Sequence, residues 1–408
     1  MPGKEQRTIM TTSATSRDAH TKPTRRGGLW SGMSLGHWLA LLARNDFAID
    51  RPFWKDALSV AATSALRTPI GWLTKLIYGG QVAATAIEKP PLFILGHWRS
   101  GTTFLHELLS LDERHTSPNT FECIAPNQFL LTERRMLPIL QRKMPKERPM
   151  DGMEVGLDRP QEDEFALCNM GEPSPYLSIA FPRHPPAFPD YLDLRTLDET
   201  ARERWKNALL EFLKRVTLYR GGSRRLVLKS PTHTARVRTL LELFPEARFV
   251  FLVRDPYLVF ASTMHMFDSL YRTYGLQLPP FPGLESQVLD TYLRLHAAFE
   301  ADRNLVPPGQ LVSLRYEDLV ADPPGVLADL YRALDLGDYA PVAPAVERQL
   351  QALAAYQPNR HALPENVIRL VNTHWGPFID RFGYQRRTGA QDTPDDQTQT
   401  PEEIHDDH

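Results

Sequence analysis

Short apolar runs alternate with helix-period segments along the middle of the chain. Four runs of mainly Leu, Phe, Ile and Val have the pattern of strands buried on both faces of a parallel sheet. They lie at residues 92–95, 226–228, 249–253 and 311–314. Helical spacing is found at residues 235–244, 257–267, 287–303, 325–334 and 364–382. Strands and helices that alternate in this way predict right-handed crossovers and a central parallel sheet flanked by helices.

The segment 29–88 is predicted to form amphipathic helices, and we interpret it as a helical flank packed on the rest of the protein. Its apolar stripe comprises Trp54, Leu58, Ala61, Leu66 and Ile70. Polar residues interrupt the apolar stretch 29–49, which falls short of the roughly 18 uninterrupted apolar residues of a spanning helix. Contact of these helices with the surface of a membrane is therefore still an alternative.

Composition and charge narrow the class of protein. Hydrophobic residues make up 42% and charged residues 24% of the 408 residues, as in soluble globular proteins. A formal net charge of -2 argues against a nucleic-acid partner held by a globally basic surface. The two cysteines, Cys123 and Cys168, cannot build a disulfide framework, which favours a reducing cytoplasm.

Both ends of the chain are expected to be disordered. Residues 1–28 are polar and basic without a secretory apolar core, and residues 388–408 are acidic and nearly free of apolar side chains. Between them we expect the helical flank at 29–88 and one α/β domain at 89–387. None of the thirteen histidines has a metal-ligand spacing, so no metal is predicted.

A glycine-punctuated loop follows the first apolar run and precedes a helical pattern. Gly96-His97-Trp98-Arg99-Ser100-Gly101-Thr102-Thr103 places two glycines, a cation and three hydroxyls where a helix begins. Such a loop presents backbone N–H groups and the positive end of the helix to an anion. Its spacing matches GxxxxG, but Thr102 stands where nucleotide triphosphatases carry Lys. A kinase that uses ATP is therefore an alternative, as is a non-catalytic binder of phosphorylated nucleotides.

The segment GHWRSGTTFLHELL resembles the 5′-phosphosulfate loop of the sulfotransferase superfamily, in the Arg-Ser-Gly-Thr-Thr form of many bacterial members and of the tyrosylprotein enzymes. The resemblance extends from about Pro91 to Tyr384. It implies a P-loop-like three-layer domain and transfer of a sulfuryl group from 3′-phosphoadenosine 5′-phosphosulfate (PAPS) to a hydroxyl or amine. The residues expected to hold the phosphosulfate are Arg99, Ser100, Gly101, Thr102, Thr103 and Phe104.

A second nucleotide contact is expected at the end of the run 249–253. Arg254 stands at the carboxyl end of this predicted strand, the edge of an α/β sheet where ligands bind. Its spacing to Ser262 resembles the family's 3′-phosphate site, and Tyr316 corresponds to a residue near the adenine. The family's late Arg-Lys-Gly segment is not recognisable, and Arg381, Arg386 and Arg387 are candidates to replace it.

The catalytic groups are identified from the same resemblance. Lys229 ends the run 226–228 at the family's spacing from Arg254 and is expected to stabilise the leaving group. The general base is expected to be Glu122, which follows the loop as in tyrosylprotein-type members, with His233 as second choice. A third option is the acidic run that contains Glu162 and Glu164. The acceptor, whether a small molecule, carbohydrate or lipid, and the oligomeric state are not readable from the sequence.

Overall fold

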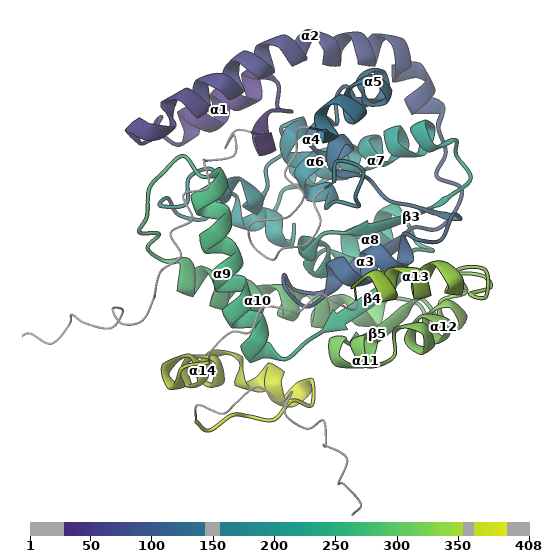
Figure 1. Ribbon diagram of the computed structural model, residues 1–408. Helices are drawn as coiled ribbons and strands as arrows, with labels where there is room; N and C mark the ends of the chain where they lie inside the picture. The colour runs from purple at the N-terminus through teal and green to yellow at the C-terminus, as the bar shows by residue number, and fades with distance from the viewer. Residues whose placement is uncertain (1–27, 143–155, 354–362, 390–408) are drawn as a thin grey trace, which may run out of the picture.

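The computed structural model describes residues 28–142, 156–353 and 363–389 (Figure 1). The tails predicted to be disordered, 1–28 and 388–408, lie almost entirely outside these residues. The acidic run, the loop and every candidate site residue lie within them.

Five parallel strands form one central sheet. They are β1 (Leu92–Leu95), β2 (His115–Thr116), β3 (Arg225–Lys229), β4 (Arg248–Val253) and β5 (Leu311–Arg315), in the order β2-β3-β1-β4-β5. The four predicted strands are confirmed, and the two-residue β2 was not predicted. Because β1 pairs with both β3 and β4, Ile94 is in register with Lys229 and with Val250. The carboxyl ends of the central strands therefore lie side by side.

Side chains alternate between the two faces of the sheet, and helices cover both. Leu92 and Ile94 pack on the face covered by α3 (Thr102–Leu109), α11 (Tyr316–Ala321), α12 (Pro323–Ala333) and α13 (Ala343–Leu353). Phe93 and Leu95 pack on the opposite face, where the covering helices are α4 (Thr120–Ile124), α6 (Asp163–Met170), α7 (Glu199–Arg220) and α8 (Val237–Leu243). The predicted three-layer α/β architecture, with apolar strands buried on both faces, is confirmed.

Three further helices lie beside this layered core and share a second apolar cluster. They are α9 (Pro256–Tyr274), α10 (Leu284–Asp302) and α14 (Glu365–Arg381). Tyr292 of α10 stacks on Trp375 of α14, with ring centroids 3.7 Å apart. The packing places the start of α9, and therefore Arg254, against the sheet edge.

The amino-terminal flank is helical, as predicted. It contains α1 (Leu35–Arg44) and the long α2 (Trp54–Ala84), which pack along each other at the top of Figure 1, near α5 (Phe129–Gln141). The flank packs on the core, but the apolar stripe is only partly buried. Trp54, Leu58 and Leu66 are 41%, 62% and 75% exposed, whereas Ala57 and Val60 are buried. Small residues suffice on the buried side because α2 lies close against its neighbours.

Candidate active site

The loop between β1 and α3 depends on glycine at both ends. Gly96 has a φ of +146°, and a Cβ there would lie 2.6 Å from the carbonyl oxygen of Leu252 on β4. Gly101 has a φ of +93° and immediately precedes α3. Arg99 between them is also left-handed, with a φ of +66°. This backbone turns sharply onto the helix, and the first N–H groups of α3 have no intrahelical acceptor. The sharp turn from strand to helix that the sequence predicted is thus present, and the binding of an anion there stays a prediction.

The hydroxyls of the loop have different surroundings. Ser100 is buried and its Oγ donates to the His97 carbonyl at 2.7 Å, so this hydroxyl fixes the turn. The backbone N–H of Gly96 donates to Thr234 Oγ1 at 2.7 Å, which ties the loop to the segment after β3. Thr102 is buried, whereas Thr103 and Phe104 are half-buried in the first turn of α3. Their proposed contacts to a phosphosulfate stay predictions.

Arg254 and Ser262 meet the loop directly. Arg99 Nε donates to Ser262 Oγ at 2.9 Å, and Arg254 NH1 donates to the carbonyl oxygen of Arg99 at 3.2 Å. The Arg254 guanidinium lies over the Tyr316 ring, 4.3 Å from its centroid. A Cβ on Gly101 would lie 2.1 Å from the same ring. Residues from the loop, from the link between β4 and α9, from α9 and from the start of α11 thus converge on one site.

The buried Nε of Arg254 has no hydrogen-bond partner among the described residues. A buried charged donor without an acceptor is costly unless a ligand supplies one. Arg387 lies close by, because its NH2 pairs at 2.6 Å with Asp255, the residue after Arg254. The two other carboxy-terminal candidates pair elsewhere, Arg381 with Glu300 and Arg386 with Asp380. Arg387 is therefore the candidate that contacts the residue next to Arg254 in the chain.

Lys229 ends β3 next to the loop and is almost completely buried. Its Nζ lies 2.6 Å from Oε1 of Glu162, the residue that precedes α6. The other carboxylate oxygen of Glu162 accepts a 2.5 Å hydrogen bond from the Tyr176 hydroxyl. The Tyr176 ring contacts Trp98 of the loop, with centroids 5.9 Å apart. Polar contacts between Lys229, Glu162 and Tyr176 therefore connect β3 to the loop between β1 and α3.

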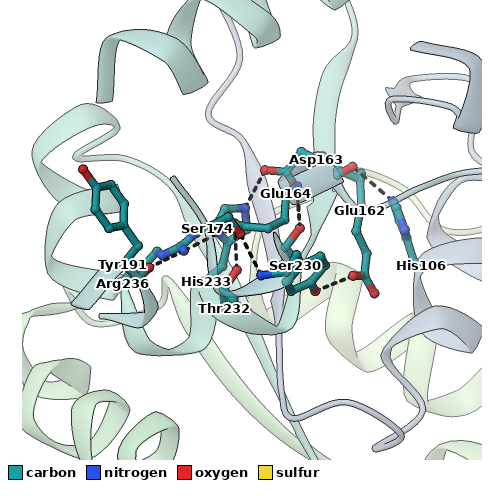
Figure 2. A network of polar contacts seen from close by, with 12 residues as sticks. His106, Glu162, Asp163, Glu164, Ser174, Tyr191, Ser230, Thr232, His233 and Arg236 are labelled. Carbon is teal, nitrogen blue, oxygen red and sulfur yellow. Dashed lines mark hydrogen bonds and ion pairs between the residues drawn. The ribbon is translucent and has the colours of Figure 1, made fainter. Parts of the chain in front are cut away.

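The acidic run before and within α6 pairs residue by residue with the segment after β3 (Figure 2). Asp163 accepts from Ser230 Oγ at 2.9 Å and lies 2.7 Å from His233 Nε2. Burial raises the pKa of Asp163, but His233 and the Ser230 hydroxyl outweigh it and leave the pKa below its usual value. These contacts fix the position of the chain directly after Lys229.

Glu164 extends the same network deeper into the core (Figure 2). It binds the Arg236 guanidinium through both carboxylate oxygens and accepts from Ser174 at 2.5 Å and Thr232 at 3.0 Å. Burial raises the pKa of Glu164, and the Arg236 charge more than offsets it. Because the pair is completely buried, loss of either partner would leave an uncompensated charge and destabilise the fold. The run thus has a structural role that its sequence alone did not reveal.

The two preferred candidates for the base are completely buried. Glu122 caps α4 through the backbone N–H of Asn119, at 2.8 Å, and its Oε1 lies 2.8 Å from Arg220 of α7. Burial, together with the neighbouring Glu133 carboxyl, raises its pKa to about 8 against the opposing effect of Arg220. His233 packs edge-on against Phe93 and pairs with Asp163. Glu162, by contrast, keeps 14% of its side chain exposed and touches Lys229.

Sequence reasoning missed the pairing of Glu162 with Lys229 and the roles of Tyr176 and Trp98. The acidic run directly before a helix was the available signal, but its partners Lys229 and Arg236 lie 67 and 72 residues away along the chain. No group of three or more His, Cys, Asp or Glu side chains in the described ranges has the arrangement of a metal site.

Comparisons with known proteins agree on one family. A family model described as "Sulfotransferase family" matches residues 90–341. The omega-hydroxy-beta-dihydromenaquinone-9 sulfotransferases Stf3 of Mycobacterium tuberculosis and Mycobacterium bovis are 44% identical to the chain over 360 residues, which cover 88% of this chain and 92% of theirs.

Solved structures share the fold at low sequence identity. The sulfotransferase STF9 from Mycobacterium avium is 19% identical with a TM-score of 0.63, covering 88% of this chain and 98% of its own. STF1 from Mycobacterium tuberculosis is 20% identical with a TM-score of 0.59, covering 86% and 90%. From the family match, the 44% identical relatives and the P-loop-like layering, it follows that this chain belongs to the sulfotransferase family.

Proposed function

We propose that the protein transfers a sulfuryl group from PAPS to a hydroxyl group of an isoprenoid-quinone lipid. The observation that carries the proposal is the convergence of Arg99, Arg254 and Ser262 at the start of α3. The N–H groups at the start of a helix bind one anion, and the guanidinium groups at the edge of the sheet bind a second one. PAPS differs from ATP-type nucleotides by such a second anionic group, the 3′-phosphate.

The residues present fit the donor. The α3 start with Gly101, Thr102 and Thr103 would hold the 5′-phosphosulfate, and the orphaned Nε of Arg254 supplies a donor for the 3′-phosphate. Arg99, Ser100, Phe104 and Ser262 complete the cofactor set carried over from the sequence, with Tyr316 beside the adenine. Arg387 would replace the missing Arg-Lys-Gly segment because it lies against Asp255.

The reaction needs a proton acceptor and a cation for the leaving oxygen. The acceptor oxygen forms a bond to sulfur while the bond from sulfur to the bridging phosphate oxygen breaks. The electron pair of that bond leaves with the 5′-phosphate of 3′-phosphoadenosine 5′-phosphate. Lys229 would stabilise this charge, and a carboxylate would take the hydroxyl proton. The nucleotide carries the sulfuryl group, so the protein's part is positioning, charge stabilisation and proton removal.

The contacts favour Glu162 over Glu122 and His233 as that carboxylate. Glu162 lies 2.6 Å from Lys229 and is partly exposed, so an acceptor can reach it. Glu122 is engaged with Arg220 and the start of α4, and His233 is engaged with Asp163 in the core. Both residues remain in the candidate set, and their buried contacts suit positioning better than proton transfer.

The lipid acceptor is inferred from the Mycobacterium relatives. Their name specifies a hydroxylated dihydromenaquinone, and 44% identity over 88% of this chain supports a related acceptor here. An ATP-dependent kinase is not favoured, because Thr102 occupies the position of the Lys that cradles the β- and γ-phosphates.

Transfer from PAPS to an ω-hydroxylated menaquinol in detergent micelles tests the proposal. We expect a sulfated product detected by mass spectrometry and one equivalent of 3′-phosphoadenosine 5′-phosphate for each product formed. Magnesium and ATP in place of PAPS should give no phosphorylated product. Phosphorylation of the same lipid, or the absence of transfer with both donors while the nucleotide is bound, would contradict the assignment.

A further inference from the structure

The outward face of α2 is apolar. Nine large hydrophobic residues in and around α1 and α2 are more than a third exposed, out of fourteen in the described part of the chain. They are Leu39, Phe47, Trp54, Leu58, Leu66, Trp72, Leu73, Leu76 and Ile77. Leu66, Trp72 and Leu76 are 75%, 71% and 83% exposed. Single exposed apolar residues are ordinary, but a contiguous set on one element indicates a binding surface.

Helical geometry places these residues together. At about 100° per residue, Leu58, Leu66, Trp72, Leu76 and Ile77 project within an arc of about 140° on α2. The exposed positions between them are also apolar or small, for example Ala62, Ala65 and Pro69. The buried residues Ala57, Val60, Ser64, Thr74 and Val82 lie on the opposite side. The helix therefore presents its bulky apolar residues outward, the reverse of an ordinary surface helix.

Positive charges border this face. Residues 57–87 contain no Asp or Glu, and Lys75 is exposed, whereas the half-buried Arg67 donates to Ser31. The neighbouring α5 adds exposed Arg134 and Arg135 beside Met136 and Ile139, which are 38% and 50% exposed. Helices α2 and α5 pack together (Figure 1). An apolar face bordered by Lys and Arg complements the acyl chains and anionic headgroups of a bilayer.

We propose that the outer face of α2, with the exposed end of α5, docks the protein onto the surface of a membrane that contains anionic lipid. None of the helices in the described ranges has the length and apolarity needed to cross a membrane. A helix of 31 residues is about 45 Å long and would lie in the plane of the interface, with its aromatic and aliphatic side chains among the lipids. Trp72 and Trp54 are the residue type that prefers this depth.

The opposite side of this helical flank leads toward the active site. Ala57 and Val60 of α2 belong to the same apolar cluster as Trp98 of the phosphate loop and Tyr176, the partner of Glu162. Docking would therefore hold the active site close to the bilayer. This consequence rests on the proposed function, since it matters for a lipid acceptor that does not leave the membrane.

Vesicle co-sedimentation tests the docking without any acceptor. The full-length protein is mixed with phosphatidylcholine vesicles with and without phosphatidylglycerol. We expect binding that is stronger with phosphatidylglycerol and weaker at high salt. The combined substitutions Leu66→Gln, Trp72→Gln and Leu76→Gln should lower the partition coefficient by more than about tenfold. These side chains are exposed, so the melting temperature should change little.

A control variant removes three large hydrophobic side chains that are exposed elsewhere on the protein. Leu278→Gln, Leu305→Gln and Val320→Gln alter side chains that are 45%, 45% and 49% exposed and should leave vesicle binding unchanged. Thermal stabilisation by 3′-phosphoadenosine 5′-phosphate should be the same in both variants, which separates docking from the nucleotide site. Wild-type protein that stays in the supernatant with both vesicle types would overturn the proposal. The proposal would also be overturned if the protein bound no vesicles and light scattering showed a dimer that the α2 substitutions dissociate.

Discussion

The substitution Glu162→Gln is expected to lower kcat by ~10²–10⁴-fold, the range of general-base contributions, with the KM for PAPS changed by less than about threefold. Glutamine preserves the size of the side chain and can still bond to Tyr176, but it cannot accept the hydroxyl proton. Because Glu162 is partly exposed at the start of α6, the fold should tolerate the change. Steady-state transfer rates and a thermal melt on the same preparation measure both effects.

The control for this prediction is Glu122→Gln. Glu122 is completely buried, and its pKa of about 8 makes the protonated form favourable near neutral pH, so glutamine replaces it closely. We expect kcat to stay within about threefold of the wild-type value. The opposite pattern, with Glu122→Gln inactive and Glu162→Gln active at unchanged stability, would return the role of base to Glu122.

The substitution Gly101→Ala is expected to weaken binding of the donor by at least ~100-fold. The new Cβ would lie 2.1 Å from the Tyr316 ring, and the residue would have to keep a φ of +93°. Both the ring and the start of α3 would shift, which displaces the N–H groups and Arg254 together. Isothermal titration with 3′-phosphoadenosine 5′-phosphate measures the loss.

Gly222→Ala provides the comparison. Gly222 also has a positive φ, of +88°, but a Cβ there meets nothing within 4 Å. The substitution Gly222→Ala should lower the free energy of unfolding by about 1–2 kcal/mol, because alanine is strained in the left-handed backbone conformation. It should leave nucleotide affinity unchanged. Unaltered affinity in folded Gly101→Ala would show that the loop does not bind the nucleotide.

Local sequence patterns predicted much of the fold and the position of Arg254 at the end of a strand. Continuous apolar runs indicated the four main strands, and Arg254 could be placed at a ligand-binding edge because it follows the strand 249–253. Its contact with the loop was then a consequence of the parallel order, since β1 and β4 are neighbours. These features depend on short-range pattern and general topology, which a single sequence contains.

Long-range pairing could not be predicted in the same way. Glu162 and Lys229 lie 67 residues apart, and no local pattern indicates that they meet. The orientation of α2 could likewise not be predicted, because an apolar stripe with helical period looks the same whether it faces a core or a lipid surface. The exposed Leu66 and the buried Val60 distinguish the two only once the neighbouring elements are placed.

The most direct test of the account is the affinity for 3′-phosphoadenosine 5′-phosphate relative to 5′-AMP, measured by isothermal titration in wild type and in Arg254→Ala. We expect the wild type to bind the bisphosphate at least ~100-fold more tightly, because charge-assisted bonds from guanidinium groups recognise the 3′-phosphate. Arg254→Ala should reduce that ratio at least ~10-fold while leaving the affinity for 5′-AMP nearly unchanged. Equal affinities of the wild-type protein for the two nucleotides would contradict the proposed donor site.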